Sequence, residues 1–196
     1  MSAFLLSLVV IFVAELGDKS QLMALTFATR FRALPVLVGI SVATALVHLA
    51  SVVLGAVLGA VLPTGPISIL AGLAFFGFAA WTLRGDELTE DERRRATTAT
   101  RSAMLAVGGA FFLAELGDKT MLATITLAAE SPGVAGLIGV WAGSTVGMVA
   151  ADALAIGVGR LLGRRLPERA IKIGAAVAFA VFGALLLIDG IRILVS

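Results

Sequence analysis

The stretch Ala14-Glu15-Leu16-Gly17-Asp18-Lys19-Ser20 places two acids and a lysine inside an otherwise apolar segment. It returns one hundred residues later as Ala114-Glu115-Leu116-Gly117-Asp118-Lys119-Thr120. The correspondence extends outward to the pair Phe12 and Phe112. A seven-residue polar motif that recurs within apolar sequence indicates an internal duplication.

The composition around the motif predicts an all-α integral membrane protein. Of the 196 residues, 59% are hydrophobic and 14% are charged, and the mean hydropathy is +1.05. A soluble domain of this length needs more polar side chains than that to cover its surface. The chain has no cysteine, so disulfides, thiolate metal sites and thiol nucleophiles are excluded.

Six apolar stretches are long enough to cross about 30 Å of hydrocarbon as helices. Short connectors with turn residues, such as Ser131-Pro132-Gly133, separate most of them. The segment 85–101 is instead dense in charge and is expected to be a solvated loop or a short surface helix. The predicted spans are 3–28, 34–62, 66–84, 102–129, 133–160 and 170–195.

The spans form two three-helix repeats within a single transmembrane domain, about 1–84 and 102–196, joined by the loop at about 85–101. Because each repeat has an odd number of spans, the second copy is expected to be inverted relative to the first. Inverted repeats are typical of transporters, which bind substrate at the repeat interface near the midplane. A weaker match between Gly55–Gly59 and Gly159–Gly163 sets His48 opposite Asp152.

The distribution of basic residues predicts the orientation in the membrane. Twelve of them lie in or beside the loops after the first, third and fifth spans, and only Arg192 lies at the other side. Cytoplasmic loops carry such an excess, so both termini are expected to be extracytoplasmic. The twelve are Arg30, Arg32, Arg84, Arg93, Arg94, Arg95, Arg101, Arg160, Arg164, Arg165, Arg169 and Lys172.

The motif acids predict a cation site. In a continuous helix Glu15 and Asp18 share one face, as do Glu115 and Asp118, so four carboxylates are expected to converge if the two copies meet. The motif glycines allow close helix approach and weaken the helix, which frees backbone carbonyls as further ligands. Such hard oxygen donors suit Ca²⁺, Mn²⁺ or Mg²⁺. The predicted ligands are Glu15, Asp18, Glu115, Asp118, Ser20 and Thr120.

Further polar residues within the spans have two interpretations each. Lys19 and Lys119 either supply positive charge to the cluster or form i,i+4 ion pairs with the glutamate of their own helix. With both lysines in the cluster, the net charge is −2, which one divalent cation or two protons neutralise. The candidates for a relay or gate are Lys19, Lys119, Gln21 (matched by Met121 in the second copy), His48 and Asp152, the last two also being candidates for helix-packing hydrogen bonds.

The twofold Glu-x-Gly-Asp-(Lys/Arg)-(Ser/Thr) motif resembles the signature of a family of manganese/calcium:proton antiporters, which includes Golgi and thylakoid transporters and bacterial manganese exporters. The resemblance covers nearly the whole chain. It implies export of Mn²⁺ or Ca²⁺ in exchange for protons across the plasma membrane, with the cation as substrate and no resident cofactor. It also implies that Glu15, Asp18, Glu115 and Asp118 bind the cation.

The sequence also permits functions other than cation export. An exporter of a small cationic or amino-acid solute and a non-transporting membrane assembly factor both remain open. An enzyme is not expected, because an aspartyl intramembrane protease needs Gly-x-Gly-Asp, and Glu15 and Glu115 stand where its first glycine should be. A zinc protease needs a motif with more than one histidine, and His48 is the only histidine in the sequence. Membrane lipid is the expected environment, nucleic acid is not an expected partner, and a homo-oligomer remains open.

Overall fold

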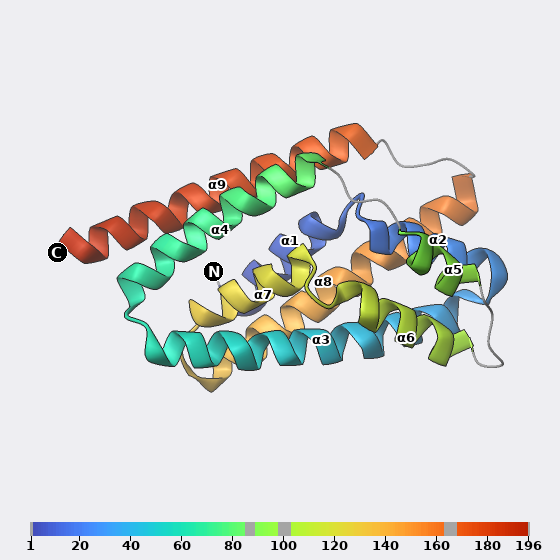
Figure 1. Ribbon diagram of the computed structural model, residues 1–196, viewed down its shortest axis with the longest axis horizontal. Coiled ribbons are helices and arrows are strands. Elements are labelled where there is room, and N and C mark those ends of the chain that lie inside the picture. Colours follow the sequence, from blue (N-terminus) through green and yellow to red (C-terminus); the bar gives the residue numbers. More distant parts are fainter. Residues whose placement is uncertain (1, 85–88, 98–102, 163–167, 196) are drawn as a thin grey trace.

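The computed structural model describes residues 2–84, 89–97, 103–162 and 168–195, and this part of the chain contains helices and no strand (Figure 1). The first half contains α1 (Ala3–Glu15), α2 (Lys19–Arg30), α3 (Ala33–Val61) and α4 (Thr64–Arg84). The short helix α5 (Glu90–Thr97) lies within the predicted loop. The second half contains α6 (Ala103–Glu115), α7 (Lys119–Ala129), α8 (Gly133–Leu162) and α9 (Glu168–Val195).

Four of these helices, α3, α4, α8 and α9, are long and apolar enough to cross a membrane, and α1, α6 and α7 are shorter apolar helices. Large apolar side chains such as Leu54, Val57 and Leu185 are exposed, whereas many polar side chains are buried. This is the reverse of a soluble domain and suits a protein whose outer surface meets lipid. The predicted bounds of the four long helices agree with the structure to within a few residues.

The two remaining predicted spans, 3–28 and 102–129, are not continuous helices. Each is interrupted at its motif glycine, where Gly17 has φ +75° and Gly117 has φ +82°. Glycine adopts this left-handed conformation without the penalty that a Cβ atom brings. The expectation that the glycines weaken the helix is therefore confirmed. The expectation that Glu15 and Asp18 share a helix face at i and i+3 is wrong, because the helix ends between them.

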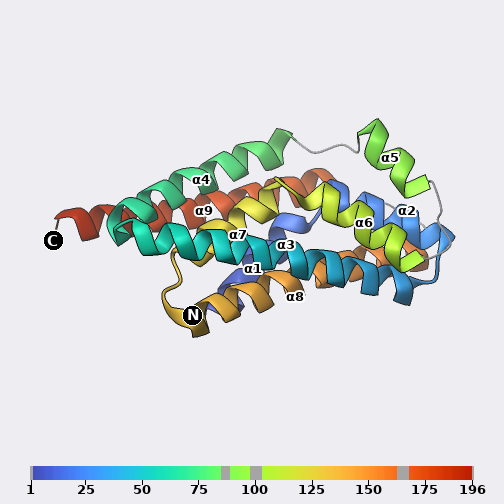
Figure 2. The ribbon, with the colours of Figure 1, turned by 60° about the horizontal axis from the view of Figure 1, so that its bottom comes forward.

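Each half of the chain packs its interrupted helix against the long helix of the other half. The helix α1 runs along α8, while α6 and α7 run along α3 (Figure 2). A Cβ atom added to Gly39 would lie 2.8 Å from the Met104 carbonyl oxygen, and one added to Gly139 would lie 3.1 Å from the Phe4 nitrogen. The two contacts are related by the same shift of one hundred residues, so the halves pack reciprocally.

The same shift of one hundred residues also relates the positions of α3 to those of α8. The helices begin at Ala33 and Gly133, and a shift of one hundred residues places Met148 opposite His48. The alignment that set His48 opposite Asp152 differs by four residues, about one helical turn. It was based on a glycine spacing whose second member, Gly163, lies outside the described residues.

The last helix of each half packs against its counterpart. The helices α4 and α9 lie side by side along one edge of the molecule (Figure 1). A Cβ atom on Gly72 would lie 2.8 Å from the Gly183 carbonyl oxygen, and one on Gly183 would lie 2.8 Å from that of Gly72. Close backbone approach through small residues is typical of helix pairs in lipid.

Candidate cation site

Both helix interruptions lie inside the molecule, between the midpoint of its long axis and the end that carries α5 (Figure 1). The four motif acids there are almost completely buried: Glu15 is 0% exposed, Asp18 1%, Glu115 1% and Asp118 3%. Asp18 and Asp118 occupy the N-cap positions of α2 and α7, yet neither side chain makes a capping hydrogen bond to its own helix. The Asp18 carboxylate is instead engaged by Lys119 of the other half.

The acids of the two halves lie close enough to interact electrostatically. Glu15 interacts with Glu115, Asp152 and Asp18, and Asp118 interacts with Asp18. Like charges held together in a medium of low dielectric constant repel strongly unless cations or protons compensate them. The structure therefore brings together the acids of both motif copies, and it adds Asp152 of α8 to them.

The compensating groups that the chain supplies come partly from across the interface. The Lys119 ammonium, 3% exposed, donates to Asp18 Oδ1 of the other half in a buried ion pair. The Ser20 hydroxyl lies 3.4 Å from Asp18 Oδ2, and the Thr120 hydroxyl donates to Glu115 Oε2 at 2.9 Å. Both motif hydroxyls therefore contact a motif carboxylate, although in different ways.

Several buried carboxylate oxygens accept no hydrogen bond in the described structure. Around the motifs these are both oxygens of Glu15, Asp118 and Asp152, and Oε1 of Glu115, and Oε1 of Glu130 is a further one away from the motifs. A buried polar atom without a partner is costly, and it is the kind of group to which an ion or a proton binds. Within the described residues, however, no three His, Asp or Glu side chains stand close enough to hold a metal ion as they are placed. Cation binding would thus require the carboxylate side chains to move closer together.

Comparison with known proteins identifies the chain. The family model of the divalent cation/proton antiporter GDT1 matches residues 3–90 and 103–193. The chain belongs to this family. The family consists of transporters, which confirms the resemblance seen in the motif, the cation/proton antiporter class and the expectation that the chain is not an enzyme.

Three relatives illustrate the breadth of this family. A Vibrio cholerae protein named "Putative manganese exporter" is 33% identical over 88% of this chain and 84% of its own length. Protein PAM71 of Arabidopsis thaliana is 34% identical over 93% of this chain, which spans 55% of that longer protein. A GDT1-like protein of Synechocystis is 28% identical over 93% of this chain and 95% of its own length. No solved structure matches the chain.

The two lysines of the motif have different partners, and neither arrangement follows from i,i+4 helical spacing. Lys119 pairs with Asp18, whereas the Lys19 ammonium lies 3.3 Å from Glu92 Oε1 of α5. The intrahelical pairs considered from the sequence require a continuous helix from Glu15 to Lys19, and the interruption removes it. Lys119 therefore lies within the cluster, while Lys19 lies at its edge.

The other relay candidates, Gln21 on α2, His48 on α3 and Asp152 on α8, are all buried. Gln21 accepts the Gly17 N–H at 2.8 Å through Oε1 and donates through Nε2 to the Ala151 carbonyl at 3.0 Å, which ties the first interruption to α8. In the second copy the Met121 sulfur lies 3.1 Å from the Gly117 nitrogen. The expected asymmetry at this position is therefore a difference in how the two turns are held.

His48 and Asp152 lie in the interior, each 1% exposed or less. His48 Nδ1 lies 3.4 Å from the Thr145 hydroxyl. Sequence reasoning missed a further buried pair, Thr44 and Ser144, both 0% exposed. A usable signal was present, because these two hydroxyl residues are also separated by one hundred positions.

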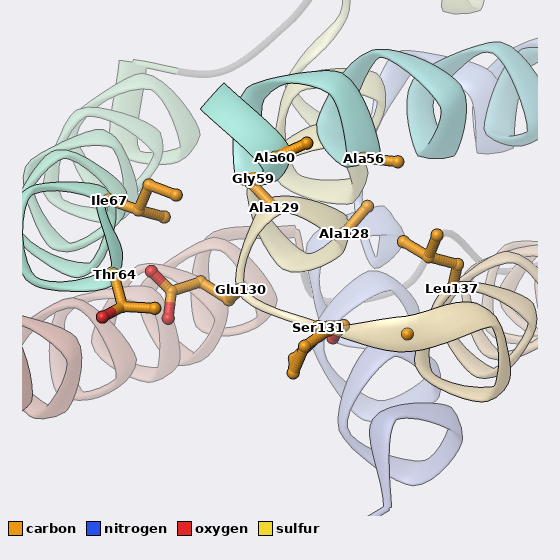
Figure 3. Close-up of a pocket in the computed structure, with 12 residues that line it drawn as sticks. Ala56, Gly59, Ala60, Thr64, Ile67, Ala128, Ala129, Glu130, Ser131 and Leu137 are labelled. Atoms are coloured by element: carbon orange, nitrogen blue, oxygen red, sulfur yellow. The ribbon is translucent and has the colours of Figure 1, made fainter. Parts of the chain in front are cut away.

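A separate cavity of about 280 Å³ lies away from the motifs, between the ends of α3 and α7 and the starts of α4 and α8 (Figure 3). The Glu130 side chain, which follows α7, extends from its wall toward Thr64. Ser68 donates to Glu130 Oε2 at 3.1 Å. Burial raises the pKa of the Glu130 carboxyl, the Ser68 hydrogen bond opposes this shift, and the charge of Asp189 adds to it.

Proposed function

We propose that this protein exports a divalent cation, Mn²⁺ in the first place and Ca²⁺ as the alternative, in exchange for protons. The proposed ligands are Glu15, Asp18, Glu115 and Asp118, with the hydroxyls of Ser20 and Thr120 beside them. One observation carries the proposal: buried carboxylates from both halves interact with one another, and several of their oxygens have no hydrogen-bond donor.

The donor chemistry supports a hard cation. Every candidate ligand is a carboxylate, hydroxyl or backbone oxygen, which suits Mn²⁺, Ca²⁺ or Mg²⁺ and disfavours soft ions such as Cu⁺. Membership of a divalent cation/proton antiporter family supports this class. The name of the Vibrio cholerae relative favours Mn²⁺ among these ions.

The charges in the cluster support an exchange that leaves its net charge unchanged. The sequence-based count of −2 assumed that both lysines face the acids, but Lys19 is paired with Glu92. Four motif carboxylates and Lys119 then leave three negative charges, and an ionised Asp152 adds a fourth. Replacing one divalent cation by two protons keeps the total constant whatever the fixed charges are. We therefore propose that one cation is exchanged for two protons. In this proposal Asp152 accepts a proton beside the ligands, and Gln21 and His48 lie along the path of the protons.

The membrane arrangement that goes with this function has six spans in two inverted repeats. In it, α1 with α2 and α6 with α7 each form one interrupted span, and α3, α4, α8 and α9 form the other four. Helices interrupted near mid-membrane are the usual place for substrate sites in transporters. The reciprocal packing of the halves supports the inversion. The arginine-rich connections would face the cytoplasm of a plasma membrane, with both termini outside.

The test is reconstitution into liposomes with a pH-sensitive dye inside and an imposed pH gradient. Addition of Mn²⁺ is expected to drive proton movement, with Ca²⁺ and Mg²⁺ compared at equal concentration and lysine counterflow as the assay for the solute-exporter alternative. Asp18→Asn and Glu115→Gln are expected to abolish the Mn²⁺-dependent signal while inserting normally. Normal proton movement in both variants would overturn the site, and a transport current at clamped voltage would overturn the one-for-two exchange.

A further inference from the structure

The short helix α5 stands at one end of the molecule, outside the long helices (Figure 2). It packs against α2 of the first half and α6 of the second half. Its first turn carries Glu90, Asp91 and Glu92, of which Glu90 and Asp91 are exposed. Glu92 differs from these two neighbours because it is partly buried and points back to the transport motif.

The Glu92 carboxylate is held in place by its own helix. Its Oε2 accepts the Thr89 N–H at 2.8 Å and the Thr89 hydroxyl at 2.9 Å, and the Glu92 N–H donates to the Thr89 Oγ1 at 3.2 Å. This is a capping box, in which the N-cap residue and the residue three positions later satisfy each other. One oxygen of Glu92 is used by the cap, which leaves Oε1 for another partner.

That partner is Lys19, whose ammonium lies 3.3 Å from Glu92 Oε1. The side chains are only 17% and 12% exposed, so the pair is screened by solvent far less than a surface ion pair. Burial disfavours ionisation of Glu92, but the two Thr89 hydrogen bonds and the Lys19 charge outweigh it and hold the Glu92 pKa below its ordinary value. The ion pair is therefore present throughout the neutral pH range.

The equivalent lysine of the second half has a different partner. Lys119 turns into the cluster and pairs with Asp18. From its position at the edge, Lys19 interacts electrostatically with Asp118, with Glu92 and with Asp18, and the Asp118 charge acts on it most strongly. The two lysines occupy the same motif position, and the one that α5 contacts is the one held at the edge of the cluster, where its charge still reaches Asp118.

We propose that Glu92 is a positioning residue that retains Lys19 at the edge of the cation site and so prevents a second ammonium from competing with the cation for Asp118. The proposal rests on the proposed cation export. It makes α5 more than a connection, because its ion pair sets how much positive charge the chain itself contributes to the site. Loss of the Glu92 charge frees Lys19 to approach Asp118, which weakens cation binding.

The test uses Glu92→Gln, with Glu90→Gln as the matched control on the same turn. In liposomes, Glu92→Gln is expected to raise the KM for Mn²⁺ about tenfold with a much smaller change in kcat, because an added unit charge near the ligands acts on binding. Glu90→Gln is expected to match the wild type. The proposal is overturned if the two variants have the same KM.

A double variant separates positioning from a general effect on α5. If Glu92 acts through Lys19, Glu92→Gln is expected to change nothing in a Lys19→Met background, so the two substitutions are not additive. An equal shift of KM in both backgrounds overturns the proposal. So does a lower kcat at constant KM, which would indicate damage to the fold.

A measurement that does not depend on transport separates failure of the role proposed for Glu92 from failure of the proposed cation export. A zero-length carbodiimide coupling, followed by peptide mass spectrometry, is expected to join Lys19 to Glu92 in the wild type in detergent. Absence of this product overturns the positioning of Lys19 by Glu92. If the product forms and the wild type moves no Mn²⁺, the proposed function fails, and with it the role assigned to the ion pair.

Discussion

Replacement of Lys119 by methionine tests the cluster by removing a positive charge that the protein itself supplies. Lys119 and Asp18 are 3% and 1% exposed and form an ion pair across the two halves. Removing one member of a buried ion pair costs about 3–5 kcal/mol, because the other charge is left in the interior. Methionine has a similar length and volume, so the cost of a cavity is small. The change therefore isolates the lost charge.

The loss of stability caused by Lys119→Met depends on whether a divalent cation is present. Without divalent cation, Lys119→Met is expected to lower the unfolding temperature by about 6–20 °C, from 3–5 kcal/mol at 2–4 °C per kcal/mol for a chain of this length. Mn²⁺ at about one hundred times its Kd stabilises the folded state by about 2.7 kcal/mol. In the wild type the cation must also displace Lys119 from Asp18, so Mn²⁺ is expected to stabilise the variant more than the wild type.

The assay is thermal unfolding in detergent, followed through the fluorescence of Trp81 and Trp141, with and without Mn²⁺. Lys172→Met is the control, since Lys172 lies near the start of α9, far from the motif in sequence. Mn²⁺ is expected to raise the unfolding temperature of Lys119→Met more than halfway to that of the cation-free wild type. Equal stability of the two proteins without cation, or equal stabilisation of both by Mn²⁺, would refute the placement of Lys119 in the cation site.

Three further predictions concern packing, pH and orientation. Gly143→Ala is expected to cost about 1–3 kcal/mol in thermal unfolding, because its Cβ atom would lie 2.2 Å from the Phe4 carbonyl oxygen, whereas Gly77→Ala, with no neighbour within 4 Å, should cost far less. Because the folded-state pKa of Glu130 is raised, wild-type stability should fall as pH rises from about 4.5 through that pKa, and Glu130→Gln should remove this fall. A gap between the two proteins that does not change with pH would contradict the burial of this carboxyl. Arg94→Cys, in a chain that otherwise has no cysteine, should react with impermeant maleimide only from the cytoplasmic side, and reaction from outside would reverse the proposed orientation.

Much of the fold follows from features that are local in the sequence. Length and hydrophobicity define α3, α4, α8 and α9, and the duplicated motif indicates two related halves. The glycine within each motif also predicted a weakened helix at the right place. Whether a glycine only weakens a helix or reverses its backbone depends on packing. The positive φ angles at Gly17 and Gly117, and hence the positions of the flanking acids, could not be derived from spacing.

The partners of the two lysines show where sequence reasoning ends. Lys19 and Lys119 lie in nearly identical stretches, so any local rule assigns them the same partner. Only the packing of α5 against α2 brings Glu92 to Lys19, and this contact joins residues 73 positions apart. Asp152 was recognised as a polar residue within a span, but its approach to the motif acids depends on the packing of α1 and α2 against α8.

The central claim is that acids of both halves form one shared cation site, and counting bound ions tests it most directly. Equilibrium binding of Mn²⁺ to the purified protein in detergent is expected to give one ion per chain. Asp18→Asn in the first half and Glu115→Gln in the second half are each expected to abolish this binding. Two ions per wild-type chain, with one remaining in each variant, would mean that the halves bind separately and would contradict the claim.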